Sequence, residues 1–178
     1  MRYNRGMKNE NLLRKNVLAA LTAFAVLGLL ALPASAAGEV TGPATVVDGD
    51  TLEVAGRRFN LYGVDAPELD QTCPWPNKTI PCGDVARTAL MDLVVGVDVT
   101  CKPQSKDTDG GWLAFCSASG FDLAQNMVHT GWALAARHYS SRHASIEERA
   151  KAARRGLWKG DFSVPRDWRA GTKPGKKY

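Results

Sequence analysis

Four carboxylates lie close enough in the sequence to act on one ligand. Asp48 and Asp50 lie in the turn-like sequence DGDT, and Asp65 and Glu68 lie in the sequence DAPE. Carboxylate oxygens are hard ligands that suit calcium or magnesium. Asp-Gly and Asp-Ala-Pro are also favoured turn sequences, so the residues by themselves fit two ordinary polar turns equally.

Short strands separated by turns surround these acids. Residues 40–64 read as a meander of three strands, with DGDT and Gly56 at the turns. Residues 69–82 contain three prolines and predict a long loop. Two further strands are predicted at residues 97–103 and 111–116.

Helical periodicity recurs in three later segments. It predicts helices at residues 83–95 and 121–130, and a third that starts between Ser141 and Ser145 and ends at Gly156. Five strands and three helices indicate one α+β domain over residues 37–160. The Gly-, Pro- and Lys-rich residues 161–178 are predicted to form a flexible basic tail.

The four cysteines form an even set, which favours two disulfides among three pairings. Cys101 and Cys116 bracket the turn-rich stretch KDTDGG, so a hairpin would bring them face to face. We therefore favour Cys101–Cys116 and Cys73–Cys82. A zinc site would need two close C-x-x-C pairs, which the sequence lacks.

The first 36 residues have the features of a signal peptide. Basic residues precede an apolar run at 17–32, and an A-x-A sequence ends at Ala36. The run is shorter than the roughly 20 residues that span a bilayer. We expect cleavage after Ala36, a periplasmic or secreted protein, and no membrane span after cleavage. The alternative is an uncleaved anchor, and either Met1 or Met7 would serve as the start.

The basic composition belongs mainly to this N-terminal segment. The chain has 23 Lys/Arg and 18 Asp/Glu, and residues 1–36 hold five of the bases and one of the acids. The remaining chain is close to neutral. Net charge therefore gives no indication of nucleic-acid binding.

Several motifs together resemble the staphylococcal-nuclease-like (thermonuclease) family. They are VVDGDT, FNLYGVDAPE, a helix from Cys82-Gly83, the pattern D-x-x-G-x-x-L-A at 107–114, and ARRGLW near the end. The resemblance runs from about Glu39 to Trp158. It implies a five-stranded OB-type β-barrel with three helices.

The resemblance also implies roles for the acids. Asp50, Asp65 and the backbone carbonyl of Ala66 would hold a calcium ion on the scissile phosphate, and Asp48 would support the metal site. Glu68 would act as general base on the attacking water.

The cationic residues of that family are missing. Its two arginines match Asn60 and Gly111, while its usual lysine or arginine and its tyrosine match Thr108 and Asp109. Preplaced donors stabilise the charge that develops on phosphoryl oxygens, and loss of one typically lowers the rate about 100- to 1,000-fold. Two losses predict little phosphodiester hydrolysis.

Two arginines are candidate substitutes. Arg58 lies on the same strand face as Asn60, displaced by roughly 6 to 7 Å along the strand. Arg137 and Tyr139 fall where the family places two tyrosines beside the nucleotide.

These features favour an exported nuclease-fold protein with little or no nuclease activity that serves as a binding or auxiliary factor. The chain also resembles nuclease-like proteins of bacterial succinoglycan (exopolysaccharide) biosynthesis clusters. The implied partner is an acidic exopolysaccharide or an envelope protein. The alternative is a secreted calcium-dependent nuclease that hydrolyses DNA or RNA.

Overall fold

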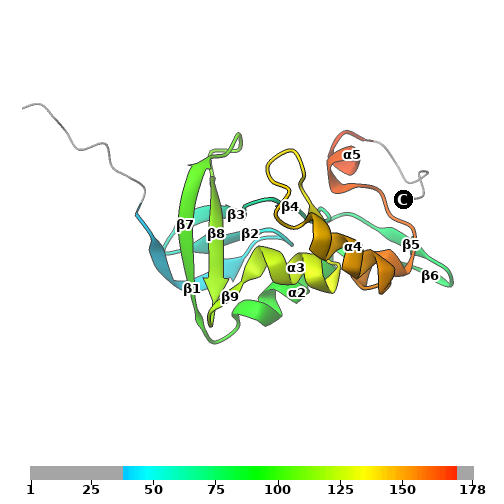
Figure 1. Cartoon of the computed structure of the whole chain (residues 1–178), viewed down its shortest axis with the longest axis horizontal. Helices are drawn as coiled ribbons and strands as arrows, with labels where there is room; N and C mark the ends of the chain where they lie inside the picture. Colours follow the sequence, from blue (N-terminus) through cyan, green and yellow to red (C-terminus); the bar gives the residue numbers. More distant parts are fainter. Residues whose placement is uncertain (1–37, 172–178) are drawn as a thin grey trace, which may run out of the picture. The chain divides into compact units, whose positions relative to one another are not determined.

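Five strands close into a barrel in the computed structural model, which describes residues 38–171. The strands β1 (Val40–Val46), β2 (Thr51–Val54) and β3 (Arg57–Leu61) form an antiparallel meander. The strand β7 (Asp98–Lys106) pairs with β1 and with β8 (Trp112–Ala118). A parallel pairing of β3 with β8 closes the barrel (Figure 1). The expected OB-type barrel is confirmed, whereas the expected signal peptide lies outside the described residues.

The barrel interior is filled by apolar side chains that alternate with exposed ones along each strand. In β3, Phe59 and Leu61 are buried, Asn60 between them is half-buried, and Arg58 before them is exposed. This period of two is what a strand needs to cover a core on one face and meet solvent on the other. Polar side chains on the outer face of β3 are therefore available to a site.

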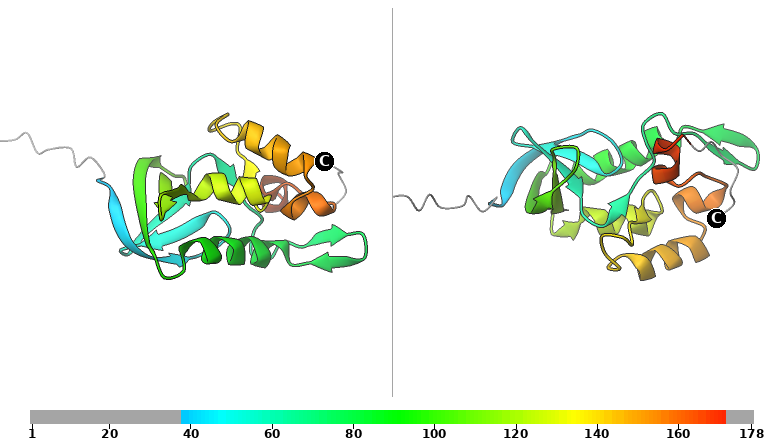
Figure 2. Two further views of the ribbon diagram at one scale, coloured as in Figure 1. Left: turned by 60° about the horizontal axis from the view of Figure 1, so that its bottom comes forward. Right: turned by 90° about the horizontal axis from the view of Figure 1, so that it is seen from above.

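Three helices form, as the sequence predicts: the first two contact the barrel and the third packs against the second. They are α2 (Cys82–Val94), α3 (Leu123–Thr130) and α4 (Ala144–Ala152) (Figure 2). The side chain of Asp122 caps α3 by accepting the Gln125 N–H, and Gly131 ends α3 in the left-handed conformation. No helix among residues 38–171 is long and apolar enough to cross a membrane.

The third helix ends earlier than predicted. The helix α4 stops at Ala152, Arg154 takes a positive φ of 50°, and a 3₁₀ turn, η1 (Gly156–Lys159), follows. A Cβ on Gly156 would lie 2.4 Å from the Gly131 carbonyl oxygen. This close approach fixes the path of the chain after α4.

Short strands add three local pairings. The strand β4 (Val64–Asp65) pairs with β10 (Leu134–Ala135), and β9 (Phe121–Asp122) extends the main sheet from β8. The strands β5 (Cys73–Trp75) and β6 (Lys78–Ile80) form a hairpin. The prediction of a loop throughout residues 69–82 is therefore wrong over residues 73–80.

The C-terminal segment corrects the predicted flexible tail at residues 161–178. Phe162, Ser163 and Val164 are buried, and the short helix α5 (Pro165–Arg169) follows them. Phe162 and Val164 join a second apolar cluster with Leu157, so apolar burial holds this segment on the domain. The prediction failed because burial of the Phe162 and Val164 side chains holds the segment in place, although its overall composition is polar. Residues 172–178 lie outside the described part.

Both expected disulfides are confirmed. Cys101 and Cys116 are directly opposite each other on β7 and β8. Cys73 and Cys82 join the start of β5 to the start of α2, with a Cα–Cα distance of 5.7 Å. Disulfides of this kind are typical of proteins outside the cytoplasm.

Candidate functional site

The carboxylates singled out in the sequence line one cleft at the side of the barrel. Its volume is about 300 Å³, and it is formed by the turn between β1 and β2, the outer face of β3, the segment after β4, the turn between β7 and β8, and α5. The charged and amide side chains that line it are Asp48, Asp50, Arg58, Asn60, Asp65, Glu68, Asp107, Asp109 and Arg169.

A close approach of three chain segments brings the first two acids to the others. A Cβ on Gly49 would lie 2.7 Å from the Ala66 Cβ and 2.8 Å from the Ala86 Cβ. Only glycine therefore allows the turn between β1 and β2 to lie against both the segment after β4 and α2. Gly49 in the sequence DGDT therefore allows close packing in addition to forming the turn.

Asp50 is the acid most strongly affected by its surroundings. Its Oδ2 accepts the Ala66 N–H at 2.6 Å and its Oδ1 accepts the Thr51 hydroxyl at 3.2 Å. Burial raises the pKa of Asp50 well above its usual range, and the charge of Asp48 adds to this, although the Ala66 N–H opposes it. A cation beside Asp50 would favour its ionised form.

Asp65 and Glu68 are held by the pairing of β4 with β10 and by the loop that follows. Asp65 lies opposite Leu134. The Gln71 side chain is fully buried and accepts the Glu68 N–H at 3.3 Å. A Cβ on Gly83 would lie 1.7 Å from the Glu68 carbonyl oxygen, so the loop rests directly on the first turn of α2.

Arg169 is the residue of the cleft that the sequence analysis missed. Its Nη1 donates to Asp65 Oδ1 at 2.9 Å and to Glu68 Oε1 at 2.5 Å. Partial burial disfavours its charge, but the hydrogen bonds and charges of Asp65 and Glu68 outweigh this and raise the pKa of Arg169. The carboxylates predicted to hold calcium and to act as base thus share a guanidinium.

The other side of the cleft contains an amide bound to two acids. Asn60 Nδ2 donates to Asp107 Oδ2 at 2.6 Å and to Asp109 Oδ2 at 3.2 Å. The Gly111 N–H donates to Asp109 Oδ1 at 2.9 Å and lowers the pKa of Asp109. Burial opposes this, but Asn60 and Arg58 also lower the pKa. Asn60 and Gly111, the two positions at which the family resemblance implies arginines, thus both donate to Asp109.

The two arginines predicted as substitutes differ in position. Arg58 lines the cleft, with its Nε 3.5 Å from Asp109 Oδ2. Arg137 is not among the residues that line it, and its guanidinium donates to Glu147 and Glu148 at 2.9 Å each. The structure therefore does not place Arg137 as a substitute, because two acidic side chains already hold its charge. Tyr139 does line the cleft.

The donor atoms of the cleft suit calcium in chemical type. Asp50, Asp65 and the Ala66 carbonyl would hold the ion, which would supply positive charge to an anionic ligand. Among residues 38–171, however, no three acidic, His or Cys side chains are gathered closely enough to hold a metal ion. Asp65 is bound to Arg169 instead. Whether calcium binds stays a prediction.

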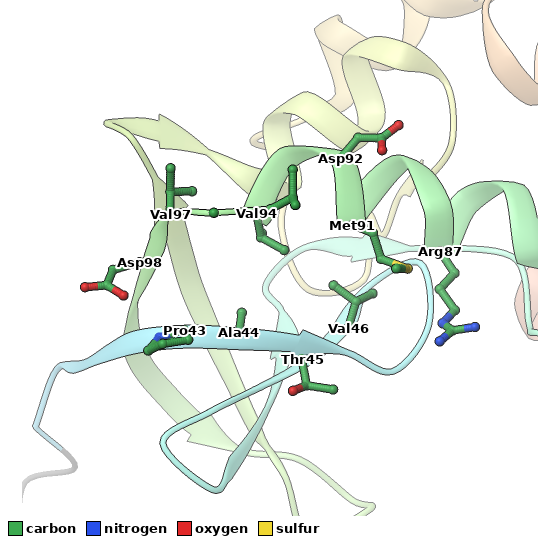
Figure 3. Close-up of a pocket in the computed structure, with 12 residues that line it drawn as sticks. Pro43, Ala44, Thr45, Val46, Arg87, Met91, Asp92, Val94, Val97 and Asp98 are labelled. Carbon is green, nitrogen blue, oxygen red and sulfur yellow. The ribbon is translucent and has the colours of Figure 1, made fainter.

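A second and larger concavity of about 770 Å³ lies between β1 and α2 (Figure 3). Apolar side chains from both elements and from the connection to β7 face it, including Val46, Met91 and Val97. None of the predicted site residues lines this groove. Arg87, Asp92 and Asp98 also line it, so the groove offers apolar contact with charged groups beside it.

Comparison with known proteins identifies the family. The family model described as staphylococcal nuclease homologue matches residues 58–160. The chain belongs to the staphylococcal nuclease family. The matched region includes Asp65, Ala66 and Glu68, while Asp48 and Asp50 precede it.

Three similar proteins belong to very different organisms. The chain is 33% identical over 148 residues to the succinoglycan biosynthesis protein ExoI of Rhizobium meliloti (strain 1021). The matched residues cover 80% of this chain and 73% of that protein. It is 32% identical over 122 residues to the probable staphylococcal-like nuclease CAN3 of Oryza sativa subsp. japonica, or 66% of this chain. It is 30% identical over 122 residues, 67% of this chain, to an uncharacterized 38.1 kDa protein of Capnoides sempervirens. The matches cover only 30% and 33% of the latter two proteins.

Proposed function

We propose that this protein is an exported member of the staphylococcal nuclease family that binds an exopolysaccharide during its biosynthesis and hydrolyses phosphodiesters weakly or not at all. The name of the Rhizobium relative points to succinoglycan as the polymer. The two disulfides and the signal-like N-terminus support a periplasmic or secreted location.

The observation that carries the proposal is the charge of the cleft. Six carboxylates and two guanidinium groups line it, and both guanidinium groups are paired with carboxylates. A phosphodiester needs cationic donors for the charge that develops as it is cleaved. Within residues 38–171, the cleft offers no arginine or lysine that is free of an acidic partner.

A saccharide suits the same cleft better than a phosphodiester does. Ionised carboxylates only accept hydrogen bonds. Sugar hydroxyls donate hydrogen bonds, whereas the oxygens of a DNA phosphate only accept them and carry negative charge. A neutral, hydroxyl-rich stretch of a polymer therefore fits the six acids, and the acidic substituents of the polymer would lie outside the cleft.

Binding is tested by titrating purified succinoglycan into residues 37–178, with and without calcium, and following the heat of binding. Glu68→Gln changes an acid of the cleft, and Asp98→Asn changes an exposed acid beside the apolar groove as the matched control. We expect binding that Glu68→Gln weakens at least several-fold and Asp98→Asn leaves unchanged. No binding by the unmodified protein would refute the proposal.

The nuclease alternative is tested in parallel, because all four of the expected acids do line the cleft. Single-stranded DNA and RNA are incubated with the protein and with Glu68→Gln, in calcium or in chelator. We expect no cleavage above the background of the variant. Calcium-dependent cleavage that disappears in Glu68→Gln would establish the nuclease instead.

A further inference from the structure

The C-terminal segment places a cation on two acids of the cleft. The Arg169 guanidinium bridges Asp65 and Glu68, whose side chains are 14% and 32% exposed. Asp65 and Glu68 precede Arg169 by 104 and 101 residues. The contact therefore depends on the path of the whole C-terminal segment.

Residues 160–169, which we call the strap, are fastened to the loop that carries Glu68. The Asp161 N–H donates to the Pro74 carbonyl at 2.9 Å, and Gln71 Nε2 donates to the Ser163 carbonyl at 2.8 Å. The Trp168 indole N–H donates to Asp70 Oδ1 at 3.0 Å. These three tertiary hydrogen bonds hold the strap at its start, middle and end.

Close packing supports the same placement. A Cβ on Gly160 would lie 2.4 Å from Trp75 Cδ1 and 2.8 Å from the Pro74 carbonyl oxygen, so the strap begins in direct contact with β5. The Cys73–Cys82 disulfide ties β5 to α2. The strap thus rests on a covalently fixed surface.

Arg166, on the same helix, provides the contrast. Its Nε lies 3.6 Å from Asp167, the next residue, and both side chains are largely exposed. A solvent-exposed pair of this kind contributes little to stability. Arg169 instead reaches into the cleft and contacts two partly buried acids. These contacts give its side chain a defined position.

We propose that Arg169 is a built-in counter-cation that competes with divalent metal ions for Asp65 and Glu68. When the Arg169 side chain lies in the cleft, its Nη1 donates to Asp65 Oδ1. The guanidinium charge would repel a metal ion placed a few ångströms from it. A divalent ion therefore enters only as the Arg169 side chain leaves. The strap keeps the guanidinium close to the cleft in both states. This proposal does not depend on which polymer, if any, the protein binds.

The first test is a calcium titration by calorimetry, with terbium luminescence as a second metal readout. Residues 37–178 are compared with Arg169→Gln and with Arg166→Gln, which removes a charge from the same helix. An opposite charge at this distance typically changes the affinity of a carboxylate for a competing cation by a factor of about 10 or more. We expect calcium to bind Arg169→Gln about tenfold more tightly, and Arg166→Gln within about twofold of the unmodified protein.

Thermal unfolding supplies an independent readout. In chelator, Arg169→Gln should melt at a lower temperature, because Asp65 and Glu68 lose their shared cation. Since the stabilisation by a bound ligand grows with the logarithm of its affinity, saturating calcium should raise the melting temperature of this variant more than that of the unmodified protein. Trp168→Phe, which loosens the strap but keeps Arg169, should show a smaller change in the same direction and serves if Arg169→Gln does not fold.

Three results would overturn the proposal. One is a calcium affinity in Arg169→Gln and Trp168→Phe that is unchanged or weaker. Another is an equal gain in calcium affinity in Arg166→Gln, which would mean that the effect comes from net charge alone. The third is no divalent binding in any variant, because Arg169 would then have no competitor.

Discussion

The acidic side chains on the two sides of the cleft are bound in different ways. The carboxylate side, formed by Asp48, Asp50, Asp65, Glu68 and Arg169, holds every acid implied by the family resemblance and a cation from the C-terminal helix α5. The turn side, formed by Arg58, Asn60, Asp107, Thr108, Asp109 and Gly111, holds the positions at which the resemblance implies cations, and its acids bind Asn60 and Arg58.

The difference between the two sides lies in where the partners of the acids come from. On the turn side, Asn60 and Arg58 are both engaged by Asp109, so its polar groups bind one another. On the carboxylate side, the acids are neutralised from a distant segment. On the turn side, a ligand therefore meets polar groups that are already hydrogen-bonded to one another. On the carboxylate side, it meets acids whose cation, Arg169, can be exchanged.

The largest expected effect comes from restoring the turn side. The variant Asn60→Arg, Thr108→Lys, Asp109→Tyr, Gly111→Arg reinstates the family pattern. Gly111 does not have a positive φ, and the tightest contact of a new Cβ would be Asp109 Oδ1 at 3.1 Å, which the variant removes. Because each cationic donor typically contributes about 100- to 1,000-fold, calcium-dependent cleavage of single-stranded DNA should rise at least 100-fold.

The control for this variant is the same set of changes with Glu68→Gln. It should remain at background if the carboxylate side provides the base. Cleavage that stays at background in both would mean that the carboxylate side has itself lost the chemistry of the family.

A smaller effect is expected on the carboxylate side, from Asp50→Asn measured in chelator. Because the pKa of Asp50 is raised by folding, its contribution to stability is present below the unfolded pKa and is lost as pH rises through the folded value. The amide oxygen can still accept the Ala66 N–H. At pH 7 the variant should be more stable by about 1 kcal/mol.

The measurement is urea unfolding at several pH values. The advantage of Asp50→Asn should shrink toward zero as pH falls to the ordinary range of an aspartate. An advantage that is constant with pH would place its origin in packing rather than in charge.

The smallest effect is expected on the turn side, from Asp109→Asn. The pKa of Asp109 is lowered, so its contribution is present above the unfolded pKa and is lost as pH falls through the folded value. Its side chain is 43% exposed, so screening limits the loss to about 0.5 kcal/mol at pH 7. Unfolding curves should converge with those of the unmodified protein in acid, and a difference that grows in acid would contradict this.

Local patterns predicted much of this molecule. The alternation of apolar residues predicted the five barrel strands, and the turn between Cys101 and Cys116 predicted their pairing. Gly49, between two aspartates, marked the turn that reaches Ala66. Each of these depends on residues that are near in sequence or on one regular element.

Contacts between distant segments could not be predicted in this way. Arg169 lies in a five-residue helix that begins at Pro165, within a composition typical of a loose tail. The position of its side chain in the cleft depends on the burial of Phe162 and Val164 elsewhere in the fold. Arg137 was misplaced for a similar reason, since Glu147 and Glu148 reach it from α4.

The Cys73–Cys82 disulfide also bears on which part of the fold depends on oxidation. The barrel strands pair through contacts that do not involve it. The surface under the strap includes β5, which this bond ties to α2. Loss of the bond is therefore expected to loosen the support of the strap and to leave the pairing of the barrel strands in place.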